Sequence, residues 1–266
     1  MAVSQHVFPR KSIARFAGSD GRVHIDMRPD NLIRRAKPTD SIFCAQRAWD
    51  SGSEVGFIKK LEDDFQRLAE SILESRVSSF GGEQTHIISC FYVLWMARAE
   101  IRDQPQQDAV LQGILPGREW SKDDEERLEK VGLAYLRGTT FPARMLNGLH
   151  VQTQVGRYLR QVNPTACWGV VRASGGEFVV PDWPVHAFIP INPILALANP
   201  AIHQTLNRES VGAVNKQRAA RLRRQPSACC VVDAKPPPLS LTSNLNQRVF
   251  LRGTVAALPS SHRSRR

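Results

Sequence analysis

The sequence has no long apolar run and lacks the short motifs of the common nucleotide-binding and hydrolytic enzymes. Its longest apolar run, Ile87–Ala97, has 11 residues, which is too few to span a bilayer and is typical of a buried helix. It contains no G-x-x-x-x-G-K-[ST] or G-x-G-x-x-G loop, no G-x-S-x-G and no H-E-x-x-H. These absences argue against a membrane partner and against a hydrolase or nucleotide enzyme of a familiar kind.

Cysteine is scarce and scattered. There is no C-x-x-C and no Cys/His cluster with zinc spacing, and the five cysteines are Cys44, Cys90, Cys167, Cys229 and Cys230. An odd, dispersed set is typical of reduced thiols in a cytosolic protein. The N-terminal residues also lack the apolar core of a signal peptide. We therefore expect a cytoplasmic protein with no cofactor and no metal site.

Acidic residues are too few to balance the basic ones, but the excess is local. The chain has 36 Lys and Arg against 25 Asp and Glu, a net charge of +11. Residues 201–266 hold 12 basic and two acidic side chains, so this segment carries +10 and the first 200 residues carry +1. The basic charge therefore belongs to a C-terminal block, and the rest of the chain is nearly neutral.

Within that block, five cations fall in nine residues, and on a helix several would share one face. They are Lys216, Arg218, Arg221, Arg223 and Arg224. Such a face can follow a phosphate backbone. No aromatic residue is interleaved to stack on bases, which argues against sequence-specific or single-strand recognition. The stretch indicates either non-specific nucleic-acid binding or a solvated basic surface.

Hydrophobic periodicity predicts helices in the middle of the chain. Apolar residues recur every three or four positions from Glu54 to Arg76, the pattern of an amphipathic helix. A more apolar helix is expected over 83–103. Ser121 and the acids after it predict the start of a third helix that runs to about Arg137. A fourth is expected over 142–162, with four apolar residues facing inward: Met145, Leu149, Val155 and Leu159.

The two ends of the chain have strand-like patterns. Arg22–Asp26 alternates like a short strand, and residues 166–173 and 177–180, separated by Ser-Gly-Gly, predict a β-hairpin. An apolar stretch over 187–198, a helix over 209–224 and a strand over 228–232 follow. We therefore expect one α+β domain over residues 5–232, in which a central layer of about four helices is flanked by β-rich N- and C-terminal parts. The basic, Pro- and Ser-containing residues 233–266 are expected to form a disordered tail.

Three polar residues are candidates for chemistry. His6, just before Pro9, could act as a general base or metal ligand, or could hydrogen-bond a neighbouring element. Arg98 follows the most apolar segment, so it needs a partner: it could meet a core carboxylate such as Glu62, or line a pocket. Asp182 lies at a predicted strand end between two prolines, a position for acid–base chemistry or for a simple turn.

Taken together, these motifs resemble a bacterial family of unknown function, number 4238. The resemblance covers residues 5 to about 232, and its motifs are Gln5-His6-x-x-Pro9 with Ile13 and Phe16, Asp20-Gly21, Glu62, Arg98, Phe178–Pro184, Ile189-Pro190-x-x-Pro193 and Val214-Asn215. It implies a single intracellular α+β domain without an established activity. The polar positions that match are His6, Arg98, Asp182 and Asn215. The sequence departs from the family at Ile42-Phe43-Cys44, where the family is rich in aromatic residues, and at Pro181, where it has Ser or Thr.

Two functions remain as hypotheses. The first is non-specific nucleic-acid association through the basic C-terminal helix and tail, in a mobile-element or defence setting. The alternative is a hydrolase or nuclease-like enzyme with a polar site that includes His6, Arg98 and Asp182. The acidic-x-Lys pair of a restriction-type nuclease is missing after Asp182.

Overall fold

The fold is α+β, as the sequence predicts. The computed structural model describes residues 4–27, 32–77, 79–104, 106–161, 165–184, 186–201 and 203–220, with the side chains of 217–220 excepted. All of them lie in one compact unit of the chain. The strand expected over 228–232 and the tail expected over 233–266 lie outside the described residues. Among the described residues, no helix has the length and apolar character needed to cross a membrane.

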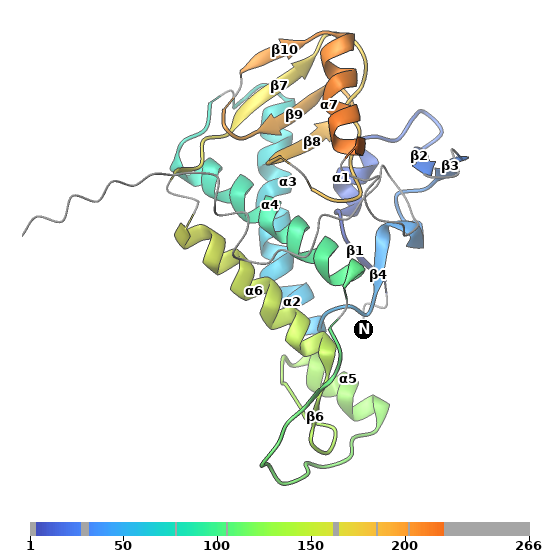
Figure 1. The fold of residues 1–266 in the computed structure, drawn as a ribbon, viewed down its shortest axis with the longest axis vertical. Coiled ribbons are helices and arrows are strands. Elements are labelled where there is room, and N and C mark those ends of the chain that lie inside the picture. The colour runs from blue at the N-terminus through green and yellow to red at the C-terminus, as the bar shows by residue number, and fades with distance from the viewer. Residues whose placement is uncertain are drawn as a thin grey trace, which may run out of the picture. The chain divides into compact units, whose positions relative to one another are not determined.

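Three helices form the centre of the fold (Figure 1): α3 (Lys59–Leu73), α4 (Gly82–Asp103) and α6 (Ala143–Gln161). Helix α4 packs against both of the others. Its apolar residues are buried nearly all round, whereas α3 buries a single face, as the two sequence patterns require. The rings of Phe65 and Phe91 stack where α3 meets α4. A short helix, α2 (Ser51–Ser53), and a π-helical turn (Glu54–Ile58) lead into α3.

Two details of the predicted helices are wrong. Helix α5 (Lys122–Lys130) ends well before Arg137, because Gly132 adopts a left-handed φ of 75° and closes the helix. In α6, Met145 and Val155 are buried as predicted, but Leu149 is 56% exposed. The inward face there carries Asn147 and Gly148 instead, since it meets the segment before α3 rather than an apolar surface.

The N-terminal part is built from small antiparallel ribbons. Strand β1 (Ser4–His6) pairs with β4 (Cys44–Gln46), and β2 (Val23–Met27) pairs with β3 (Leu32–Ala36); β2 confirms the predicted strand. Helix α1 (Arg10–Ala14) and a 3-10 turn (Ser41–Phe43) complete this part. A third ribbon pairs β5 (Ala109–Val110) with β6 (Thr140–Phe141), and Figure 1 shows β6 beside α5.

A four-stranded sheet forms the C-terminal part. Its order is β10 (Gln204–Leu206), β7 (Gly169–Ala173), β9 (Leu195–Ala198) and β8 (Phe188–Asn192). Strands β8 and β9 are antiparallel neighbours, β7 is antiparallel to β9, and β10 runs parallel to β7. Helix α7 (Arg208–Ala220) buries Val211 in an apolar cluster with residues of this sheet.

The hairpin predicted over 166–180 is wrong. Residues 177–180 form no strand. The N–H of Phe178 donates to the carbonyl of Pro193 at 2.7 Å, and the side chain of Asn215 on α7 bonds the backbone on either side of it. The segment is therefore held between α7 and the turn after β8, and β7 pairs with β9 and β10 instead.

Candidate ligand-binding site

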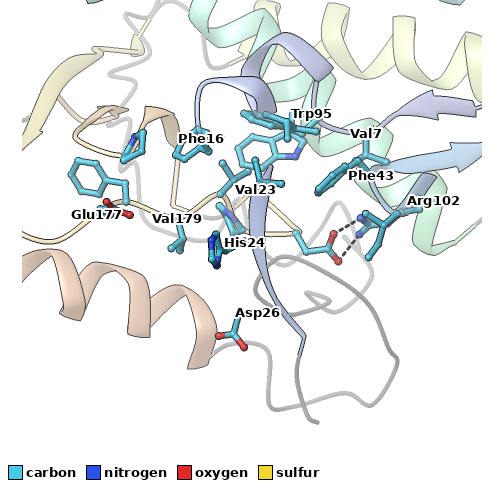
Figure 2. A pocket seen from close by; sticks show the side chains of 18 residues that line it. Val7, Phe16, Val23, His24, Asp26, Phe43, Trp95, Arg102, Glu177 and Val179 are labelled. Atoms are coloured by element: carbon cyan, nitrogen blue, oxygen red, sulfur yellow. Dashed lines mark hydrogen bonds and ion pairs between the residues drawn. The ribbon is translucent and has the colours of Figure 1, made fainter. Parts of the chain in front are cut away.

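A cavity of about 240 Å³ opens where the N-terminal ribbons, α4 and the segment 177–182 meet (Figure 2). Most of its wall is apolar. The aromatic side chains in the wall come from four separate parts of the chain, and they are Phe8, Phe16, Phe43, Trp95 and Phe178. Such a surface excludes water and favours an apolar ligand surface by the hydrophobic effect.

An ion pair forms one polar end of this pocket (Figure 2). Arg102, in the last turn of α4, donates from Nη1 and Nη2 to the two carboxylate oxygens of Asp182; the Nη2–Oδ2 distance is 3.0 Å. Its Nε also donates to Asp103 at 2.8 Å. The side chains of Arg102 and Asp182 are 21% and 20% exposed. The pair is thus largely desolvated and still open to the pocket.

The two carboxylates keep Arg102 charged. Burial acts to lower the pKa of its guanidinium, but Asp182 and Asp103 outweigh burial and raise this pKa above its usual value. A fork-shaped guanidinium held by two acids is fixed in orientation. The pair therefore presents a rigid arrangement of donors and acceptors to anything in the pocket.

Three further polar residues line the pocket: His24 and Asp26 on β2, and Glu177. In Figure 2, Glu177 and Arg102 lie at opposite ends of the lining, with His24 between them. Glu177 and His24 are exposed and Asp26 is half-buried. These three side chains therefore belong to the solvent-facing part of the pocket.

Asn215 supports the wall of the pocket without lining it. Its Nδ2 donates to the carbonyl of Glu177 at 2.8 Å, and its Oδ1 accepts from the N–H of Val179 at 3.5 Å. The backbone of 177–180 has no strand partner, so these bonds satisfy groups that would otherwise be left to water. Asn215 is therefore a positioning residue for one side of the pocket.

The other two predicted candidates lie elsewhere. A ring nitrogen of His6, Nε2, lies 3.0 Å from the carbonyl of Pro38, and its Nδ1 lies 3.6 Å from the Sγ of Cys44. This confirms the hydrogen-bonding alternative for His6. Arg98 is 1% exposed and bonds Glu62, its predicted partner, as well as Glu54. Neither residue lines the pocket.

The pocket therefore includes Asp182 but neither His6 nor Arg98. The structure pairs Asp182 with Arg102, a residue that is not among the candidates predicted from the sequence. A signal was present: Arg102 lies one helical turn beyond Arg98 in the same helix, and residues four apart share a face. No sequence pattern joined it to Asp182, which is 80 residues away.

The predicted nucleic-acid residues fall mostly outside the described part. Lys216 is exposed on α7. The side chain of Arg218 and all of Arg221, Arg223 and Arg224 lie outside the described residues.

Among the described residues, no group of three or more His, Cys, Asp or Glu is placed to hold a metal ion. The described cysteines are free thiols that are half-buried (Cys44), buried (Cys90) and exposed (Cys167). No family model, no curated protein and no solved structure matches the chain.

Proposed function

We propose that this domain binds a small organic molecule in the pocket between its N-terminal ribbons, α4 and the segment 177–182. One observation carries the proposal: the ion pair of Arg102 and Asp182 lies at one end of a mostly apolar cavity. A mostly apolar wall with a few convergent polar groups is the usual composition of ligand pockets.

The size of the cavity limits the ligand. A volume of 240 Å³ lies just below the ~300–1,000 Å³ of most small-molecule pockets. The ligand is therefore small, about the size of one aromatic ring with a short chain. Its apolar body would lie against Phe43 and Trp95.

The ion pair supplies orientation. An arginine side chain has five N–H groups, and the bonds to Asp182 and Asp103 use three of them. Two N–H groups of Arg102 thus remain for a neutral acceptor such as a hydroxyl or carbonyl oxygen of the ligand. Because the guanidinium is already fixed, little side-chain entropy is lost on binding.

The test uses a neutral probe, phenylpropanol, titrated into the full-length protein by calorimetry and followed by ligand-observed NMR. We expect saturable binding with a Kd of about 1 mM or tighter, as befits a ligand of this size. Val179→Phe, which places a ring in the pocket wall, should abolish it. Val55→Phe is the matched control, because Val55 is 71% exposed and does not line the pocket. Absence of saturable binding to the wild type, or equal binding by both variants, would overturn the proposal.

A second candidate is non-specific nucleic-acid association, and the charge of residues 201–266 favours it. The described part adds an open hollow whose wall carries three cations, Arg10, Lys11 and Lys37. Lys11 is engaged with Glu70. Phosphate contacts of this kind give affinity without sequence preference and weaken as the salt concentration rises.

This candidate is tested with a random-sequence DNA duplex at low salt. We expect replacement of Arg218, Arg221 and Arg224 by Ala, or truncation after Asp233, to weaken binding and to reduce its salt dependence. Replacing Arg10 and Lys37 by Ala tests the hollow separately. The candidate fails if the wild type does not bind the duplex, or if it binds as tightly as all three variants.

A further inference from the structure

We infer that the ligand of this pocket is a small organic cation, an amine with an apolar body, and not an anion. The inference rests on the proposed function and names its ligand class. It is carried by the charges that face the pocket, whose sign is opposite to that of the chain as a whole. The chain carries +11, yet three of the four charged side chains in the pocket lining are acids: Asp26, Glu177 and Asp182, against Arg102.

Arg102 is not available as an anion site. Its charge faces two carboxylates, Asp182 and Asp103, at hydrogen-bonding distance. An anionic ligand would have to approach this guanidinium alongside both acids, and like charges at close range repel. The remaining N–H groups of Arg102 can bond a neutral oxygen but cannot compensate a full negative charge.

Glu177 places a further negative charge at the opposite end. Its side chain is exposed at the pocket, and no described basic side chain forms a salt bridge with it within 4.0 Å. Its backbone is fixed by Asn215, which bonds the carbonyl of Glu177 itself. The carboxylate is therefore held near the opening, where no salt bridge to a described side chain has to break before it meets a ligand cation.

The sign of this charge does not depend on Asp26. Without it, the lining still sets two carboxylates, Asp182 and Glu177, against one guanidinium, a net charge of −1, and that guanidinium is also held by Asp103 from outside the lining. A low-dielectric apolar wall strengthens the effect of such charges on a bound ion. A ligand that places its ammonium group beside Glu177 and its apolar body towards Trp95 would form an ion pair with the carboxylate and an apolar contact with the wall.

Three probes of nearly equal shape separate the ligand classes: phenylpropylamine, phenylpropanol and phenylpropanoate. At pH 8 and low salt, we expect the amine to bind more tightly than the alcohol, and the acid to bind most weakly. The amine should exceed the acid by about tenfold. High salt should reduce this difference, because part of the site faces solvent.

Substitutions at Glu177 test whether this residue causes the preference for the amine. Glu177→Gln should weaken binding of the amine about two- to fivefold, the size expected of a partly exposed ion pair, and should leave the alcohol unchanged. Glu177→Lys should weaken the amine further and improve the acid. Glu119→Gln is the matched control, since Glu119 is an exposed acid outside the pocket lining and should alter none of the three.

The outcomes distinguish this inference from the proposed function. If no probe binds, the pocket is not a binding site and both fail. If the alcohol binds but the amine binds no better, or if Glu177→Gln leaves the affinity of the amine unchanged, the cation inference is overturned and the binding site stands.

Discussion

Gly148 of α6 lies against the carboxylate of Asp50, so closely that a Cβ at position 148 would overlap the Oδ2 of Asp50. That carboxylate is fixed, because it accepts from the N–H and the hydroxyl of Ser53 at 2.7 Å each. Helix α6 therefore packs on the start of α2 through bare backbone. No side chain could occupy position 148 without displacing the cap of α2.

The first prediction concerns this contact. Gly148→Ala should lower the free energy of unfolding by about 3 kcal/mol or more, because the methyl group overpacks a fixed polar cluster. Gly156→Ala, in the same helix, should raise it by about 0.5–1 kcal/mol, since a Cβ there meets only Arg160 Nη1 at 3.7 Å. Urea unfolding measures both. Similar values for the two variants would contradict the packing described.

The second prediction concerns acid stability. Glu125 on α5 is buried beside Arg137 and Arg144. The hydrogen bond from Arg137, with weaker help from Tyr135 and Arg144, outweighs burial and lowers the pKa of Glu125 from 4.5 to about 2. A carboxyl group whose pKa is lowered by folding stabilises the protein above its unfolded pKa and loses that effect as the pH falls.

Between pH 5 and pH 2, the wild type should therefore lose about 2–3 kcal/mol more unfolding free energy than Glu125→Gln does. Glu125→Gln should already be less stable at pH 7, because Arg137 and Arg144 each lose one of their two carboxylate partners and keep only Asp108 and Glu129, respectively. Asp123→Asn, an exposed acid on the same helix, should keep the wild-type pH dependence. Denaturant titrations at several pH values measure the free energy of unfolding of each protein. If this free energy falls equally with pH in the wild type and in Glu125→Gln, the prediction is wrong.

The third prediction measures the ion pair of the pocket. A double-mutant cycle with Arg102→Met and Asp182→Asn should give a coupling energy of about 1–3 kcal/mol, because both side chains are mostly shielded from water. The exposed pair Lys59–Asp63 on α3 is the control and should give less than about 0.5 kcal/mol. Equal coupling in the two cycles would show that the pocket does not desolvate its pair.

The fourth prediction tests Asn215 as a positioning residue. Asn215→Ala removes two hydrogen bonds to the segment 177–180 and should cost about 1–2 kcal/mol of unfolding free energy. It should also weaken phenylpropanol binding, although Asn215 is not part of the pocket lining. Ser210→Ala, in the same helix, should leave binding unchanged. If Asn215→Ala binds the probe like the wild type, these bonds do not shape the pocket.

The sequence was informative where one segment decides its own structure. The apolar period of α3 and the long apolar run of α4 place both helices close to their observed bounds, because each pattern lies within one segment. Arg98 could be matched with Glu62, because an arginine in the most apolar helix must find an acid. The end of α5 could also have been predicted, since glycine commonly follows the end of a helix and Gly132 stands there.

The rest depends on contacts between distant segments. The turn signal at Ser174–Gly176 is real, and Gly176 has a φ of 78°. The strand expected over 177–180 does not form, because Asn215 and the carbonyl of Pro193 bond the backbone groups that would otherwise pair with β7. The pairing of Arg102 with Asp182 likewise follows from how α4 meets this segment. No sequence pattern within α4 or within the segment 177–182 predicts that the two are in contact.

The wall of the pocket draws on residues from Val7 to Pro193. A molecule bound there touches both the first ribbon and the turn after β8, so it acts as a non-covalent crosslink between the early and late parts of the chain. A partly unfolded chain does not form the pocket and so does not bind the ligand. A ligand that binds only the folded chain therefore raises the free energy of unfolding by RT ln(1 + [L]/Kd), where [L] is the free ligand concentration, and a true ligand would be recognised by the concentration-dependent rise in Tm that it causes.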